Sequence, residues 1–279
     1  MAAKLWLEFS RDASATRLRV RRQEVPWRVL RGFPNAARET LAHLNNISGG
    51  VLDRDDLEMR VDVGRGAWAQ ITSTGATRIY RSRSAAYCGR SRNEVEIGED
   101  GFLEYLPDAL IPYGGSRYEQ STRIRLARGA ALVWWEVVSP GREAAGEVFR
   151  YARLASRLEI RSDHGPLLEE HWELAPDVQS LDSAVRLGPF RHFASLYLCR
   201  AGAGIELWRD LEASLSRLAA EHSVENELLW GASSLRADGV ALRGVARNGR
   251  LLARSLTAIW QAAKPALCGR VAMPPRKIY

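Results

Sequence analysis

The chain has very little lysine, few cysteines and no long apolar run. Lys4, Lys264 and Lys277 are the only lysines in 279 residues, so arginine supplies almost all of the positive charge. The three cysteines are odd in number and far apart, which argues against a disulfide framework and a CxxC metal clip. No segment approaches the roughly 20 apolar residues that a membrane helix needs, and the N-terminal stretch lacks the apolar core of a signal peptide. We therefore expect a reduced, cytoplasmic protein with no membrane partner.

Charge of one sign is not concentrated anywhere in the chain. The formal net charge of +7 and the isoelectric point of about 9.6 would suit a nucleic-acid partner. Acidic and basic residues nevertheless alternate throughout, and no run of like charge is longer than the pair Arg21-Arg22. We therefore expect no binding to nucleic acid.

The signatures of common enzyme classes are missing as well. The sequence has no GxxxxGK[ST] phosphate loop, no GxSxG elbow and no HExxH zinc motif, and its five histidines are too scattered for a metal site on one element. The hydroxyl-rich stretch TSTGATRIYRS, residues 72–82, has no lysine and a single glycine, Gly75, which is expected to form a tight or left-handed turn. Asp53, Asp55 and Asp56 form an acidic cluster that a hard cation could use, although such loop clusters are usually solvated turn residues. These patterns favour a protein that is not an enzyme.

Alternating apolar residues predict a β-rich core from about residue 15 to residue 200. Four alternating segments each lead into a glycine-bearing turn and a second alternating segment, with turn centres near residues 65, 100, 128 and 164. We interpret each unit as a β-hairpin. The irregular spacing of about 30 to 35 residues fits hairpins that stack and bury their apolar faces on one another.

Helical periodicity appears only near the C-terminus. Apolar residues recur at steps of three and four over residues 205–222 and again over residues 249–263, and Pro265 is expected to stop the second helix. No low-complexity linker separates the strands from the helices. We therefore expect one domain over residues 1–279, of a mainly β class: a superhelical stack of β-hairpins with two C-terminal α-helices packed on it.

Two glutamates occupy positions where the pattern predicts burial. In ALVWWEVV, residues 131–138, both faces of the strand are apolar, so Glu136 should point into the protein. Glu104 stands among large apolar residues in the same way, and Asp108 follows shortly after it. An unpaired buried carboxylate costs several kcal/mol. Either the glutamates pair with arginine, or they line a water-filled passage with oxygen ligands.

A catalytic interpretation of the same residues is a further alternative. If Glu104 and Glu136 faced one open cleft, they could serve as the acid and base of a β-helical hydrolase or isomerase. This interpretation fails if the two carboxylates lie in separate, closed surroundings.

Four motifs, in their order along the chain, resemble those of a known protein family. They are SGG at residues 48–50, TSTGATRIYRS at 72–82, LEYLPDALIPY at 103–113 and WWEVVSPGREAAGEVF at 134–149. Over roughly residues 25 to 175 the chain is similar to the urease accessory proteins of the UreD type, called UreH in some species. One departure is the segment Asp53-Arg54-Asp55, which stands where family members commonly carry a second glycine pair and an aspartate, so no role is carried over for this loop.

The resemblance implies a function that the motifs alone do not. Family members are scaffolds that bind the helical accessory protein UreF, join the GTPase UreG and dock on apo-urease to deliver nickel. An internal nickel route has been proposed for the family, and it implies no tightly bound cofactor, only nickel(II) in transit. Weak oxygen ligands on the strands would suit such a route. The candidates for transient nickel contacts are Thr72, Thr74, Glu104, Asp108 and Glu136.

Overall fold

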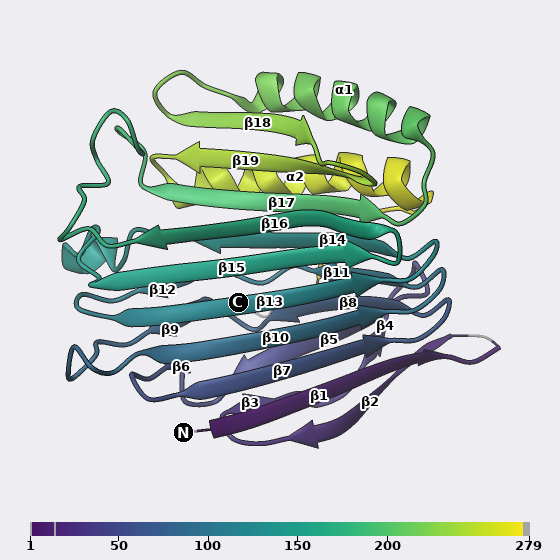
Figure 1. Cartoon of the computed structure of the whole chain (residues 1–279), viewed down its shortest axis with the longest axis horizontal. Coiled ribbons are helices and arrows are strands. Elements are labelled where there is room, and N and C mark those ends of the chain that lie inside the picture. Colours follow the sequence, from purple (N-terminus) through teal and green to yellow (C-terminus); the bar gives the residue numbers. More distant parts are fainter. Residues whose placement is uncertain (1, 14, 276–279) are drawn as a thin grey trace.

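The protein is built mainly of strands, with two helices near the C-terminus (Figure 1). The computed structural model describes residues 2–13 and 15–275. The seven-stranded sheet has the order β16 (Gly165–Leu174), β15 (Arg153–Ser162), β13 (Arg117–Leu126), β10 (Gly89–Ile97), β7 (Asp56–Val63), β1 (Ala2–Arg11) and β2 (Thr16–Gln23). A twelve-stranded sheet lies against it.

The twelve-stranded sheet follows the main path β18 (Leu228–Ser234), β19 (Gly239–Ala246), β17 (His192–Arg200), β14 (Ala131–Val138), β11 (Phe102–Tyr105), β8 (Trp68–Ser73), β5 (Thr40–Asn46) and β3 (Trp27–Arg28). Four short strands join this path at its margins: β4 (Phe33–Pro34), β6 (Gly50–Val51), β9 (Thr77–Ile79) and β12 (Leu110–Pro112). A short 3-10 helix, η1 (Glu143–Ala145), follows β14.

The chain crosses from one sheet to the other at most of its glycine turns. β7 continues into β8, β10 into β11 and β13 into β14, yet the two strands of each pair belong to different sheets. Within their own sheets these strands pair in parallel, so β10 pairs with β7 and β13 while β11 pairs with β8 and β14. Three of the four predicted hairpins are therefore wrong, and only β15 and β16 form an antiparallel hairpin.

The physical reason is that a hairpin and a crossing between facing sheets share the same local signals. Both show apolar alternation and a turn with glycine. Burial distinguishes a crossing from a hairpin. Nearly every residue of β8, β11 and β14 is buried, because these strands are covered on both faces. The predicted fold class is confirmed: the protein is mainly β, its sheets are stacked, and two helices lie near the C-terminus.

The two helices cover the end of the twelve-stranded sheet. α1 (Ile205–His222) has the predicted bounds, whereas α2 (Gly249–Cys268) runs beyond the predicted end at residue 263. Pro265 does not stop α2, because it lies in the last turn, where its missing N–H costs one hydrogen bond. The helix ends at Gly269, whose φ of 70° is left-handed and whose N–H donates to the Pro265 carbonyl at 2.7 Å. Among the described residues, neither helix is long and apolar enough to cross a membrane.

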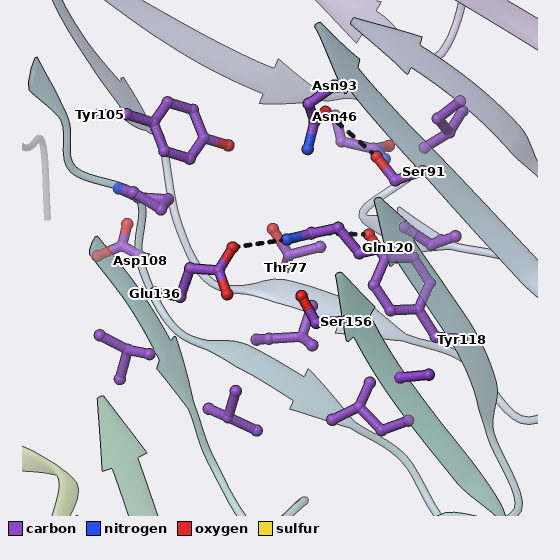
Figure 2. Close-up of a pocket in the computed structure, with 18 of the residues that line it drawn as sticks. Asn46, Thr77, Ser91, Asn93, Tyr105, Asp108, Tyr118, Gln120, Glu136 and Ser156 are labelled. Atoms are coloured by element: carbon purple, nitrogen blue, oxygen red, sulfur yellow. Dashed lines mark hydrogen bonds between the residues drawn. The ribbon is translucent and has the colours of Figure 1, made fainter. Parts of the chain in front are cut away.

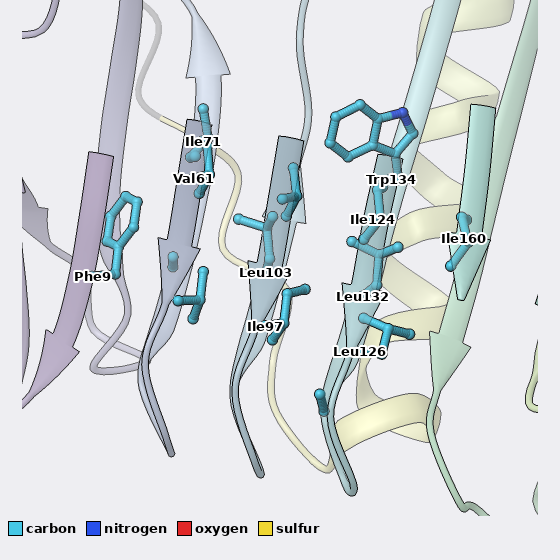
Figure 3. Close-up of a cluster of buried hydrophobic side chains, with 14 of the residues drawn as sticks. Phe9, Val61, Ile71, Ile97, Leu103, Ile124, Leu126, Leu132, Trp134 and Ile160 are labelled. Carbon is cyan, nitrogen blue, oxygen red and sulfur yellow. The ribbon is translucent and has the colours of Figure 1, made fainter. Parts of the chain in front are cut away.

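Two apolar layers hold the fold together. One fills the space between the sheets and includes Ile97, Ile124 and Leu132 (Figure 3), and the other lies between the twelve-stranded sheet and the helices. β14 supplies both layers alternately, since Trp134 faces the other sheet and Trp135 faces the helices. The predicted burial of both faces of this strand is confirmed.

Polar side chains replace apolar ones at one end of the space between the sheets. Along β10 the inward residues begin with Ser91 and Asn93 and end with apolar residues. In the parallel register Ser91 lies opposite Gln120 of β13, and Gln120 lies opposite Ser156 of β15. The seven-stranded sheet therefore presents a polar row to the facing sheet at this end.

Candidate functional site

A cavity of about 100 Å³ lies between the sheets at their polar end (Figure 2). β14 supplies Glu136 from one wall, and β10, β13 and β15 supply amides and hydroxyls from the opposite wall. Its polar lining includes Asn46, Thr77, Asn93, Asp108, Gln120 and Glu136. Alternate residues of a strand face the same side, so β10 lines the cavity with Ser91 and Asn93, and β13 lines it with Tyr118 and Gln120.

Glu136 is a partly buried carboxylate that lines this cavity. Gln120 Nε2 donates to Glu136 Oε1 at 2.9 Å, and Trp134 Nε1 donates to the same oxygen at 3.4 Å. Burial, the largest effect, and the negative charge of Glu170 together raise the pKa of Glu136 to about 7, against the two hydrogen bonds. No arginine or lysine of the described residues forms an ion pair with Glu136. The predicted pairing with arginine is therefore wrong for this residue.

Asp108 lines the same cavity and is fixed by β8. Its backbone N–H donates to Ser73 Oγ at 2.8 Å, and Ser73 Oγ lies 3.2 Å from Asp108 Oδ2. The loop after Pro107 thus holds a second carboxylate beside Glu136. One wall of the cavity therefore carries two acidic side chains, while the other walls carry neutral oxygen and nitrogen atoms.

A second cavity of about 270 Å³ adjoins the first. Exposed Thr74 and Gly75 line it, together with Gly49 and Gly50. The two cavities share five lining residues, which are Trp27, Asn46, Thr77, Tyr105 and Pro107. The space around Glu136 therefore borders a hollow near the surface, which we call the mouth.

Glycine in the SGG motif permits the close approach of two short strands at the mouth. Gly50 of β6 pairs with Arg78 of β9, and a Cβ on Gly50 would lie 2.3 Å from the Arg78 carbonyl oxygen. Gly49 has a left-handed φ of 79°. Gly75 lies in a bend between β8 and β9, as expected, but its φ is not left-handed, and a Cβ on it would meet nothing within 4 Å.

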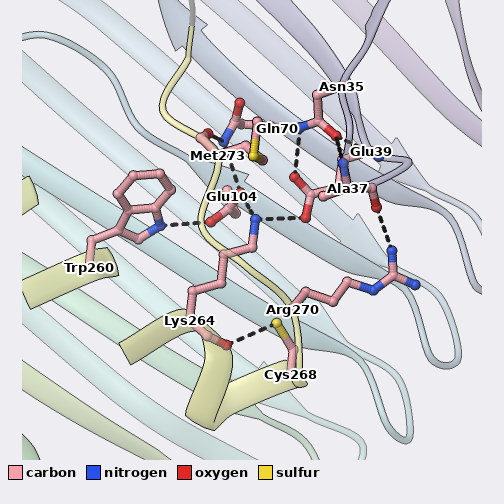
Figure 4. Close-up of polar contacts among 10 residues, drawn as sticks. All are labelled: Asn35, Ala37, Glu39, Gln70, Glu104, Trp260, Lys264, Cys268, Arg270 and Met273. Carbon is pink, nitrogen blue, oxygen red and sulfur yellow. Dashed lines mark hydrogen bonds and ion pairs between the residues drawn. The ribbon is translucent and has the colours of Figure 1, made fainter. Parts of the chain in front are cut away.

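Glu104 lies on the opposite face of the twelve-stranded sheet, against α2 (Figure 4). Lys264 Nζ lies 2.7 Å from Glu104 Oε2 and 2.6 Å from Glu39 Oε1, and all three side chains are buried. Trp260 Nε1 donates to Glu104 Oε1 at 2.7 Å, and Gln70 Nε2 donates to Glu104 Oε2 at 3.0 Å. Burial, the largest effect, raises the pKa of Glu104 to about 7. The predicted ion pair of Glu104 exists, but its partner is lysine rather than arginine.

The separation of the two glutamates rules out the catalytic alternative. Glu104 is enclosed beneath α2 and Glu136 faces the other sheet, so the two do not share a cleft. Thr72 also lies away from the cavity, where its Oγ1 donates to the Leu106 carbonyl at 2.7 Å. Of the five candidates, Glu136 and Asp108 line the cavity, Thr74 lines the mouth, and Thr72 and Glu104 line neither.

The acidic loop after SGG is structural in character. Asp53 and Asp55 are buried, not solvated as expected. Arg83 donates to both carboxylate oxygens of Asp53 and lowers its pKa, and the Leu52 N–H donates to Asp55 at 2.9 Å. These contacts pin the loop to the segment that follows β9.

Oxygen donors in the cavity suit brief contact with a hydrated divalent cation. Two carboxylates lie among amides and hydroxyls, a set that binds borderline metals weakly. Within the described residues, no group of three or more His, Cys, Asp or Glu side chains could enclose a metal ion.

Sequence comparisons agree with this structure. The family model described as UreD urease accessory protein matches residues 1–278. The chain is 39% identical over 281 residues to urease accessory protein UreD of Herpetosiphon aurantiacus, covering 100% of this chain and 97% of the relative. It is 34% identical to urease accessory protein UreD 2 of Pseudomonas syringae pv. syringae, and the match covers 98% of this chain and 93% of the relative. These names describe accessory proteins, which confirms that the chain is not an enzyme. The chain belongs to the UreD family of urease accessory proteins.

Proposed function

We propose that this protein is a scaffold that, together with UreF and the GTPase UreG, delivers nickel to apo-urease. Nickel(II) is cargo in this proposal, and it crosses the protein through the mouth and the cavity around Glu136. The family assignment supports a role in urease maturation. The partners and the route are our inference from the resemblance and from the geometry of the cavity.

The route is supported by a partly buried carboxylate, Glu136, that lines an internal space. Burying a carboxylate without a cation costs free energy, and Glu136 bears that cost inside a cavity lined by oxygen atoms. Asp108 adds a second carboxylate, and Asn46 and Thr77 carry the polar lining from the mouth to the cavity. A cation that enters would offset part of the desolvation cost of Glu136.

The ligand set also fits release. Imidazole and thiolate bind nickel more tightly than carboxylate, amide or hydroxyl oxygen. Within the described residues, none of the cavity's lining side chains is a histidine or a cysteine. Because Glu136 has a pKa of about 7, proton binding near neutral pH competes with the metal and assists its departure.

The proposal is tested by removing the protein from a urease-producing host. We expect urease to accumulate without nickel, because the subunits are still made but the delivery scaffold is absent. Metal analysis of purified urease by mass spectrometry measures this result. A tagged copy should restore the nickel content and retain UreF and UreG during purification. Urease that is fully loaded with nickel in the absence of the protein would contradict the proposal.

A further inference from the structure

A third cavity, of about 550 Å³, lies apart from the site described above. It is enclosed by residues 148–150, by the loop of residues 176–191 and by Arg247 at the end of β19. It shares no lining residue with the mouth or with the cavity around Glu136. Its volume is within the range of roughly 300–1,000 Å³ that is typical of ligand pockets.

The lining of this cavity combines an apolar floor with a basic rim. Leu181 and Phe190 are buried beneath it, with 2% and 9% of their surface exposed. Arg150, Arg191 and Arg247 lie on the rim and come from three separate segments of the chain. We call this arrangement the arginine pocket. Its floor favours an apolar side chain, and its rim favours carboxylates, which guanidinium groups bind in pairs of hydrogen bonds.

The walls of the arginine pocket are held in place by contacts outside it. The Arg191 N–H donates to the Ala246 carbonyl at 2.9 Å and fixes the loop to the end of β19. His192 Nε2 lies 2.9 Å from Glu143 of η1, which joins this corner to the segment before β15. On that segment, the Phe149 N–H donates to the Pro140 carbonyl at 2.8 Å. A pocket that is already formed loses little conformational entropy when it binds.

The positive charge of the rim is only partly balanced. Arg191 lies 3.7 Å from Glu143, but Arg150 and Arg247 are exposed and form no ion pair with any acidic side chain of residues 2–13 and 15–275. Asp177 and Asp182 lie on the loop side of the cavity. Three arginines therefore face two aspartates, and a negatively charged occupant would complete the balance.

From this chemistry we propose that the arginine pocket receives a segment of a partner protein in which an apolar side chain is flanked by carboxylates. The inference deepens the proposed function and rests on it, because the segment belongs to one of the proteins of the delivery complex. The apolar side chain inserts over Leu181 and Phe190. The carboxylates pair with Arg150 and Arg247.

Charge reversal of the rim tests the pocket against each partner separately. We expect the Arg150→Glu/Arg247→Glu variant to lose affinity for one of UreF, UreG and apo-urease by at least about tenfold, because attraction becomes repulsion. The matched control is Arg19→Glu/Arg125→Glu, which makes the same change of net charge at exposed residues of the seven-stranded sheet. Equal retention of all three partners by both variants, or equal loss in both, would overturn the proposal.

A short peptide tests the pocket without any partner, and so separates this inference from the proposed function. Arginine side-chain N–H signals are followed by nuclear magnetic resonance while acetyl-Glu-Phe-Glu-amide is added to the full-length protein. We expect saturable shifts with a millimolar Kd, lost in the Arg150→Gln/Arg247→Gln variant. An equal response to acetyl-Lys-Phe-Lys-amide, or no response up to about 10 mM peptide, would overturn the proposal. An equal response to inorganic phosphate would also overturn it, because it would indicate a site for small anions.

Discussion

Replacing Glu136 by glutamine should leave the fold and UreF binding intact and lower nickel transfer to apo-urease at least about tenfold, because a neutral amide is a poorer metal ligand than a carboxylate. Glutamine has nearly the same shape, and its Oε1 can still accept the hydrogen bond from Gln120. Leucine at position 136 should have the same effect on nickel. The measurement is the nickel content of urease that has been matured with each variant. Glu94→Gln, on the exposed face of β10, is the control and should transfer nickel normally.

The stability of the same variant gives a second check on Glu136. Its folded pKa of about 7 is above the ordinary glutamate value of 4.5, so the folded state binds the proton more tightly than the unfolded state does. The stability from this group is therefore full below pH 4.5 and is lost as the pH rises through about 7. Between about pH 5 and pH 8 the wild type should lose more stability than Glu136→Gln, by on the order of 3 kcal/mol at most. An insoluble variant would instead indicate that Glu136 is a structural residue.

Replacing Lys264 by methionine should lower the free energy of unfolding by about 3–5 kcal/mol. The ammonium group is fully buried and lies between Glu39 and Glu104, so its removal leaves both carboxyl groups without their shared cation. Urea unfolding at neutral pH measures the change. Lys4→Met is the control, because the Lys4–Glu58 pair is about half exposed, at 46% and 37% of the side chains, and should contribute at most about 1 kcal/mol.

A triple variant separates the effect of charge from that of packing at Lys264. When Glu39 and Glu104 become glutamine together with Lys264→Met, no buried charge of this cluster is left unpaired. We expect the triple variant to be more stable than Lys264→Met alone, since replacing a whole buried ion pair is often nearly neutral. If the triple variant were no more stable than the single one, the cost would come from lost packing against Phe102 and Trp260.

Local pattern predicted the elements of this protein but not how the strands pair. The apolar periodicity of residues 205–222 predicted α1 with its correct bounds, because a helix is specified by residues close in sequence. Strand pairing is specified by distant residues. The turns after β7, β10 and β13 therefore read as hairpins although they lead to the other sheet.

The candidate site could also be predicted only in part, because strand pairing decides which side chains meet. Alternation predicted that Glu136 points inward, but not which layer it faces or that Glu104 faces the other one. The polar row could have been predicted, because the inward positions at the start of β10 and β13 are polar whereas those at the ends of both strands are apolar. The burial of Lys264 could also have been predicted, because Lys264 follows Trp260 by four residues and so lies on the same face of α2.

The central claim is that nickel enters the cavity between the sheets. Crystals of the protein soaked in nickel(II) and measured at the nickel absorption edge test this most directly, because anomalous scattering locates the metal itself. We predict a nickel peak within bonding distance of the carboxylates of Glu136 or Asp108, and its loss in Glu136→Gln crystals. Nickel found only on the outer surface, or an unchanged peak in the variant, would contradict the account.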